Sequence, residues 1–307
     1  MWHRSSVNPK NFLTRFLAAN ILSSAGVKDS ALTIHGSLQA DRLGQFFAQN
    51  GLCFTKVFSS DLQRAYKTAE AIRLAQANKG GEEVAEKVLV TQLQILREQD
   101  FGFYEGKPFY VRSRDSSKSG KENHRSQHVD DPDFRDVEAK ESMNARMDNF
   151  VKDQLLPLIQ DERPGRERVI AVVSHGIILS HLWRCILKLF GKDTVTLAAG
   201  ISVGSGGVKP LEYLGGWSNT GYLELDIINT LPVEIIPIDQ YSTAASETES
   251  GTAESQESGI PALKMIVKAV NGKEHLKGLK RTRGVGSSKY DEGQKKIETF
   301  FKKVKVG

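Results

Sequence analysis

The chain has 307 residues, of which 39% are hydrophobic and 26% charged, which suits one large domain with appendages. No apolar run approaches the ~18 residues that a membrane-spanning helix needs, and two cysteines make no disulfide framework, so the composition argues against integral membrane proteins and disulfide-stapled secreted domains. The N-terminus lacks the order of a secretory signal, so we expect an intracellular protein, in the nucleus, the cytoplasm or both.

Charge is distributed unevenly along the chain. Residues 264–307 hold thirteen Lys/Arg and four Asp/Glu, a net charge of +9, whereas the whole chain carries +5, so residues 1–263 sum to −4. A basic C-terminal segment favours nuclear import, an acidic partner or, more weakly, direct contact with nucleic acid. It says little about the activity of the preceding domain.

The predicted elements alternate between strands and helices. Strands are expected at 11–17, 54–58, 88–96, 168–174, 222–228 and 232–236, and helices at 36–50, 62–77, 142–160 and 176–190. Residues 18–28 are small and typical of a loop. Residues 111–141 are polar and mixed in charge, which predicts a long surface excursion resembling a lid.

This alternation predicts an α/β fold, a three-layer sandwich whose mainly parallel central sheet has helices on both faces. Residues 242–259 are rich in Ser, Thr, Glu, Ala and Gln and hold no large apolar residue, so they cannot bury enough surface to offset their ordering entropy. We therefore assign the globular domain to 1–240, a disordered linker to 241–263 and a disordered basic tail to 264–307.

The segment 168–183 provides the first candidate functional residue. A buried β-strand pattern ends at Ser174-His175-Gly176, and an apolar helical pattern follows directly. His175 is therefore expected at the carboxyl end of the sheet, where α/β folds bind ligands and helix N-termini favour anions. A partly buried structural histidine is the alternative at this point.

Two more loops at strand ends carry charged candidates. Arg64 stands in the first turn of a predicted helix, where its charge opposes the helix dipole, which indicates a nearby anion; a solvated surface arginine is the alternative. Glu98 follows Arg97, and a weak surface ion pair between them is its ordinary explanation. An arginine fork, an imidazole and a carboxyl group meeting at one sheet end would suit phosphoryl chemistry.

Several motifs, in this order and spacing, resemble the histidine phosphatase superfamily in its phosphoglycerate mutase-like branch. They are Asp29-Ser-Ala-Leu-Thr-Ile-His-Gly36, Ser59-Ser-Asp-Leu-Gln-Arg-Ala-Tyr-Lys-Thr-Ala-Glu70, Leu96-Arg-Glu-Gln-Asp-Phe-Gly-Phe-Tyr-Glu-Gly106, Glu141-Ser142 and Val172-Val-Ser-His-Gly176. The resemblance spans residues 12–236. It implies hydrolysis or transfer of a phosphomonoester through a phosphohistidine, on a phosphorylated small molecule or a phosphoprotein.

The same resemblance implies roles for the three candidates. Arg64 would bind the transferred phosphoryl group, Glu98 would be the general acid that protonates the leaving oxygen, and His175 would donate to a phosphoryl oxygen. Phosphoryl transfer asks mainly for positioning and for cations or donors around the phosphoryl oxygens. No metal or other cofactor is implied, and the sequence offers no ligand set of suitable spacing for one.

One family motif is missing from the sequence. The family ends its first strand with Arg-His-Gly, whose histidine is the nucleophile, and we match that motif to Arg15, Phe16 and Leu17. Arg15 is then expected at the phosphate, while phenylalanine cannot attack phosphorus, so we expect little or no phosphatase activity. Two explanations stay open: a member that has lost its nucleophile, or an N-terminus that comes from a mis-joined gene product.

A short motif near the C-terminus resembles the peptide by which replication and repair proteins dock on the sliding clamp PCNA. It consists of Gln294, Ile297, Phe300 and Phe301, in which the three apolar residues share one side of a helical turn and can fill an apolar pocket. The alternative is an amphipathic helix end that packs on the domain. The chain is therefore either an enzyme of the phosphohistidine type or a non-catalytic binding protein tethered to the clamp.

Overall fold

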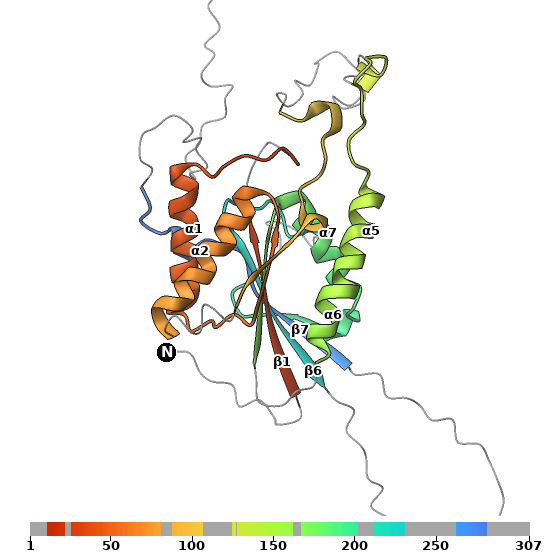
Figure 1. Cartoon of the computed structure of the whole chain (residues 1–307). Coiled ribbons are helices and arrows are strands. Elements are labelled where there is room, and N and C mark those ends of the chain that lie inside the picture. The colour runs from red at the N-terminus through yellow and green to blue at the C-terminus, as the bar shows by residue number, and fades with distance from the viewer. Residues whose placement is uncertain are drawn as a thin grey trace, which may run out of the picture.

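A mixed sheet of seven strands, in the order β3-β2-β4-β1-β6-β7-β5, runs through the part of the chain that the structure describes (Figure 1). This computed structural model describes residues 11–21, 26–80, 88–106, 125–126, 128–161, 167–201, 211–230 and 262–280. The strands are β1 (Asn11–Asn20), β2 (Lys56–Ser60), β3 (Val90–Leu93), β4 (Arg168–Ser174), β5 (Val195–Leu197), β6 (Tyr222–Thr230) and β7 (Ala262–Gly272).

Most strand pairs in this sheet are parallel. β1 and β2 both pair in parallel with β4, β3 with β2 and β5 with β7, whereas β6 runs antiparallel to β1 and β7. All seven residues of β4 are buried, because its run of Val, Ile and Ala is apolar on both faces, as a central parallel strand requires.

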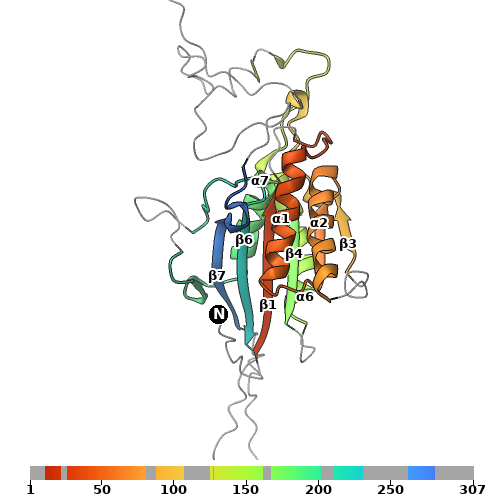
Figure 2. The ribbon, with the colours of Figure 1, turned by 90° about the vertical axis from the view of Figure 1, so that its left-hand side faces the viewer.

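Helices cover both faces of the sheet. α1 (Ile34–Gln49) and α2 (Gln63–Gly80) lie on one face, and α5 (Lys140–Phe150), α6 (Leu156–Ile159) and α7 (Gly176–Leu187) on the other (Figure 1 and Figure 2). A π-helical turn, Val151–Leu155, joins α5 to α6. Each face has its own core of buried apolar side chains, so the predicted three-layer α/β sandwich is confirmed.

The predicted boundary at the C-terminal end of the domain is wrong. Residues 262–272, which composition assigns to the linker at 241–263 and the tail at 264–307, form β7 between β6 and β5. Met265 and Val267 are fully buried in the core, while Lys264 and Lys268 alternate with them and contribute to the positive charge of the segment. This is the period-2 pattern of a strand, which the net charge concealed.

Among the other strands, β1 and β3 differ most from their predicted bounds, and β5 was not predicted. β1 continues through Ala18 and Ala19 to Asn20, although these small residues were expected in a loop; both alanines are buried, as the close packing of an inner strand allows. β3 is shorter than predicted and passes into a 3₁₀ helix, Gln94–Leu96.

Other predictions fall on residues that the structure does not describe. The strand predicted at 232–236, most of the linker, the segment 281–307 and most of the lid-like excursion lie outside the described residues. Within the described ranges, no helix combines the length and the apolar character needed to cross a membrane.

Candidate functional site

The carboxyl ends of the parallel strands β1, β2 and β4 meet at one edge of the sheet. β1 ends at Asn20, which pairs with Ser174 at the end of β4, while Ser59 of β2 pairs with Val173. The three predicted residues follow these strand ends: His175 begins α7, Arg64 lies in the first turn of α2, and Glu98 follows the 3₁₀ helix after β3. Glu98 contacts the first turn of α7, next to His175, and the positive charge of Arg64 acts on the pKa of both residues, so the three belong to one site.

His175 is the N-cap residue of α7 and is fully buried. Neither of its ring nitrogens has a hydrogen-bond partner of ordinary geometry among the described residues. Burial and the positive charge of Arg64 lower the pKa of His175 to about 3. An interaction with the backbone of Ile21 raises this pKa but offsets the other effects only in part. The imidazole is therefore neutral at physiological pH and offers one N–H donor and one acceptor.

Arg64 is a buried cation, only 2% exposed. Its Nη1 donates to the carbonyl of Lys28 (2.9 Å) and its Nη2 to the carbonyl of Gly26 (2.6 Å), while Nε has no partner within the described residues. Burial lowers the pKa of the guanidinium, and the negative charge of Glu98 opposes this, but an arginine keeps its proton in proteins. A fixed positive charge therefore stands beside His175.

Glu98 occupies the N-terminus of α7. Its carboxylate accepts the backbone N–H groups of Ile177 (3.3 Å), Ile178 (3.2 Å) and its own neighbour Gln99 (3.0 Å). Burial raises the pKa of Glu98, although these hydrogen bonds oppose the shift. The expected alternative, a surface pair with Arg97, does not form, because Arg97 instead pairs with Asp61 (2.8 and 2.5 Å).

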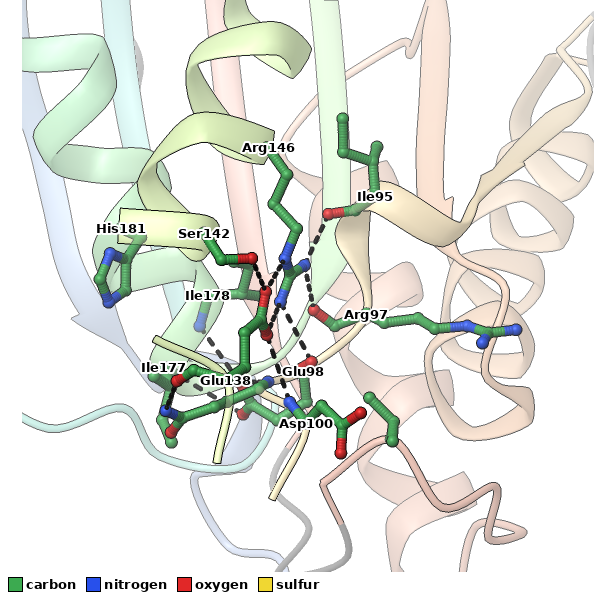
Figure 3. A network of polar contacts seen from close by, with 12 residues as sticks. Ile95, Arg97, Glu98, Asp100, Glu138, Ser142, Arg146, Ile177, Ile178 and His181 are labelled. Atoms are coloured by element: carbon green, nitrogen blue, oxygen red, sulfur yellow. Dashed lines mark hydrogen bonds and ion pairs between the residues drawn. The ribbon is translucent and has the colours of Figure 1, made fainter. Parts of the chain in front are cut away.

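Residues for which the sequence predicted no role hold the loop of Glu98. Arg146 of α5 donates to the backbone carbonyls of this loop and forms an ion pair with Glu138 (2.9 Å), as Figure 3 shows. Ser142 also donates to Glu138 (2.9 Å). Residues 138, 142 and 146 follow one another at intervals of four, the spacing of neighbours on one side of a helix. This spacing of polar residues is the sequence pattern that could have indicated their contact.

Arg15 does not belong to this site, and its predicted phosphate contact is wrong. It lies five residues before the end of β1, opposite Val169, which is about 17 Å along a strand. Its Nε donates to Asp226 (3.0 Å), and its Nη2 lies 3.2 Å from Glu167, so carboxylates hold it elsewhere in the sheet. The match of Arg15 and Phe16 to the family motif fails because β1 continues beyond them.

Asn20 and Ile21 stand where the first strand ends beside His175. The side-chain Nδ2 of Asn20 donates to the carbonyl of Ser218 (2.9 Å). Its Oδ1 is buried without a partner among the described residues. Ile21 is 1% exposed and packs in the core under α1 and α2. Neither a carboxamide nor an alkyl side chain is a nucleophile toward phosphorus.

Two other predictions concern a metal and the C-terminal motif. Among the described residues, no group of three or more His, Cys, Asp or Glu side chains is placed to hold a metal ion. His181 of α7 lies outside the site as a contact between helices, with its Nδ1 2.6 Å from the Oδ1 of Asn144 in α5. The clamp-binding residues Gln294, Ile297, Phe300 and Phe301 lie outside the described residues.

Comparison with known proteins gives relatives among phosphatases. A protein of Schizosaccharomyces pombe named probable phosphatase is 28% identical over 285 residues, which cover 90% of this chain and 72% of that protein. The fructose-2,6-bisphosphatase TIGAR of Xenopus tropicalis is 36% identical over 107 residues; the match covers 35% of this chain and only 36% of TIGAR. Among solved structures, the mycobacterial glucosyl-3-phosphoglycerate phosphatase is 18% identical, with a TM-score of 0.44 over 70% of this chain and 90% of that one.

One family model also matches the chain. It describes the histidine phosphatase superfamily (branch 1) and covers residues 19–200, so that it begins at the end of β1, beyond Arg15 and Phe16, and includes Arg64, Glu98 and His175. Because this match covers more than half of its length, the chain belongs to the histidine phosphatase superfamily (branch 1).

Proposed function

We propose that this chain binds phosphate monoesters through Arg64 and His175, beside the acid Glu98, and that it does not turn them over through a phosphohistidine. The observation that carries the binding is a set of buried nitrogen atoms: Nε of Arg64, which has no hydrogen-bond partner among the described residues, and the two ring nitrogens of His175, which have none of ordinary geometry there. The ligand expected from the family is a phosphorylated small molecule or a phosphoprotein.

Unpaired buried nitrogens need an explanation, because a polar group taken out of water without a partner costs about 1–3 kcal/mol. The Nη atoms of Arg64 bind the carbonyls of Gly26 and Lys28, whereas its Nε has no partner among the described residues and is a free donor. The neutral imidazole of His175 supplies a second donor. Phosphoryl oxygens are strong acceptors of charge-assisted hydrogen bonds, so a phosphate monoester would satisfy both donors.

We expect no turnover because of the residues that stand at the end of β1. A phosphohistidine route begins with an imidazole attacking phosphorus, and the residues beside His175 at that strand end are Asn20 and Ile21. Glu98 retains a raised pKa, which favours the protonated form that a general acid needs. Without a nucleophile the bond between phosphorus and the leaving oxygen does not break, so Glu98 has no departing oxygen to protonate, and binding without transfer is the expected behaviour.

Binding is tested by titrating the purified full chain with inorganic phosphate in a calorimeter. Arg64→Gln should weaken binding at least tenfold, because it removes a charge-assisted hydrogen bond worth about 1.5–3 kcal/mol. Arg73→Gln is the matched control: Arg73 lies further along α2 and pairs with Glu70 (2.9 Å). Equal affinities of the two variants, or no binding by the unmodified chain, would reject the site.

We further propose that Gln294, Ile297, Phe300 and Phe301 dock this chain on the sliding clamp PCNA. The spacing of the motif supports this second function, because Ile297, Phe300 and Phe301 share one side of a helical turn and can fill an apolar pocket.

Clamp binding is measured by titrating PCNA with the full chain and with the double variant Phe300→Ala/Phe301→Ala. The variant should lose binding, because it removes two of the three apolar side chains that fill the pocket. A matched control replaces Lys302 and Lys303 with Ala, which should slow association more than it weakens the complex. No binding by the unmodified chain would refute this second function.

A further inference from the structure

We propose that Arg146 and Glu138 form a positioning pair that fixes the carboxylate of Glu98 at the start of α7 and thereby keeps Arg64 open to a phosphoryl ligand. The ligand in this inference rests on the proposed function. The placement of Glu98 does not, and the two parts have separate tests.

Arg146 gathers three backbone carbonyls of one loop onto a single guanidinium group (Figure 3). Its Nη1 donates to the carbonyls of Ile95 (2.7 Å) and Arg97 (2.6 Å), and its Nη2 donates to the carbonyl of Glu98 itself (3.1 Å). A planar fork with several donors in fixed directions constrains the loop more than a lysine could. The backbone of Glu98 is therefore fixed from the side of α5.

Glu138 holds Arg146 in this orientation. Its two carboxylate oxygens accept from Nε and Nη2 of Arg146, both at 2.9 Å, which is the bidentate arrangement. Burial raises the pKa of Glu138, but the hydrogen bonds and charge of Arg146 outweigh it and leave the pKa below its usual value. The carboxylate of Glu138 also accepts from the backbone N–H of Asp100 (3.2 Å), so it binds the same loop two residues beyond Glu98.

With its carbonyl on Arg146, Glu98 directs its carboxylate to the other side, toward the first turn of α7. There it accepts the N–H groups of Ile177 and Ile178, as Figure 3 shows. Side chains of Asn144 in α5 and His181 in α7 join the two helices as well (2.6 Å). The loop, α5 and α7 are thus held together around Glu98.

This placement matters because Glu98 and Arg64 have opposite charges in the same buried site. A carboxylate that left the start of α7 would find an unpaired donor of opposite charge at Nε of Arg64, a donor that a phosphoryl oxygen needs. A direct pair between them would consume that donor and repel a phosphate dianion. The positioning pair therefore separates the acid from the phosphate-binding cation.

The first test measures the position of Glu98 directly, by NMR of the full chain without ligand. In Arg146→Gln, the amide protons of Ile177 and Ile178 should exchange about tenfold faster, because their acceptor is no longer fixed. The pKa of Glu98, followed through its ¹³C carboxyl shift, should move from its raised position. Asp148→Asn is the control: it breaks another contact between α5 and α7, the ion pair with Lys188 (2.9 Å), without touching the loop.

The second test measures affinity for inorganic phosphate. Arg146→Gln should weaken it about tenfold, and adding Glu98→Gln should restore it, because a neutral amide no longer competes for Arg64 as an anion. Restoration by a second substitution separates positioning from a general loss of stability. If Arg146→Gln does not fold, Glu138→Gln, which preserves the shape of the side chain, takes its place in both tests.

The outcomes distinguish this inference from the proposed function. Unchanged exchange at Ile177 and Ile178 and an unchanged pKa of Glu98 in the folded variant would overturn the positioning role. A tenfold loss of affinity that Glu98→Gln does not restore would overturn the separation of acid and cation. If the unmodified chain binds no phosphate, the proposed function fails, and the exchange measurement still decides whether the pair positions Glu98.

Discussion

Asn20 ends β1 directly opposite Ser174 of β4, one residue before His175. This pairing identifies the residues at the end of the first strand without reference to any motif, because parallel strands in register bring their carboxyl ends together. It moves the position at which the family's nucleophile is expected four residues along the chain from Phe16. The expectation of impaired transfer is unchanged by the move, since neither Asn20 nor Ile21 can attack phosphorus.

Removal of β7 should destabilise the domain. A chain that stops at residue 240, the boundary predicted from composition, lacks Met265 and Val267, both fully buried, and leaves β6 as an unpaired edge. We expect it to aggregate or to unfold at a temperature at least about 10 °C lower than a chain that stops at residue 280. Thermal unfolding followed by circular dichroism compares the two. Equal melting temperatures would mean that β7 is dispensable.

Gly44 sets the distance between α1 and α2. A methyl group on Gly44 would lie 2.6 Å from the carbonyl oxygen of Ala71, closer than two such atoms can approach. Gly44→Ala should therefore destabilise the protein by about 1–3 kcal/mol, although alanine is the better helix former. Denaturant unfolding gives the free energy. Ser37→Ala, at an exposed position of the same helix, is the control and should change it by less than about 0.5 kcal/mol.

How much of this fold the sequence predicted depended on the kind of signal. β4 and α7 were predicted correctly because each shows a single clear pattern. β4 is a continuous apolar run, and the apolar residues of α7 recur every four residues. β7 was missed because its core face is only every second residue and its other face is basic. The end of β1 was missed because alanine carries no strand preference, and only tertiary packing shows that Ala18 and Ala19 are buried.

Some residues of the candidate site were predictable from the sequence and others were not. Arg64, Glu98 and His175 follow strand ends, so topology predicts their meeting from a linear sequence. Arg15 was misplaced because a single arginine in a strand gives no register. Arg146 was missed because its role is to bind backbone carbonyls, which no side-chain motif announces, although its spacing from Glu138 was visible.

Three buried histidines should make the protein acid-sensitive. Burial lowers the pKa of His175 to about 3 and those of His181 and His275 to about 4, so the folded chain binds fewer protons than the unfolded chain, whose histidines titrate near 6.5. Their contribution is fully present above pH 6.5 and is lost as the pH falls toward 4 and then 3. Each histidine adds up to about 1.4 kcal/mol per pH unit to this slope.

Glu98 acts in the opposite direction. Its raised pKa means that its contribution to stability is present at low pH and is lost as the pH rises through its titration. One carboxyl does not cancel three imidazoles between pH 6.5 and 5. Urea unfolding at a series of pH values should therefore show stability falling on acidification, and His275→Gln should make the slope shallower. A stability that is flat, or that rises, from pH 6.5 to 5 would contradict these assignments.

The central claim is that this chain, with Asn20 and Ile21 at the end of β1, binds a phosphoryl group without accepting it covalently. The most direct measurement is incubation of the full chain with a phosphomonoester, p-nitrophenyl phosphate, followed by assay of the released alcohol and by mass analysis for an acid-labile phosphohistidine. We predict no phosphohistidine, and no turnover beyond any background that His175→Gln leaves unchanged. Turnover that His175→Gln abolishes, or a phosphohistidine at any position of the unmodified chain, would contradict the claim.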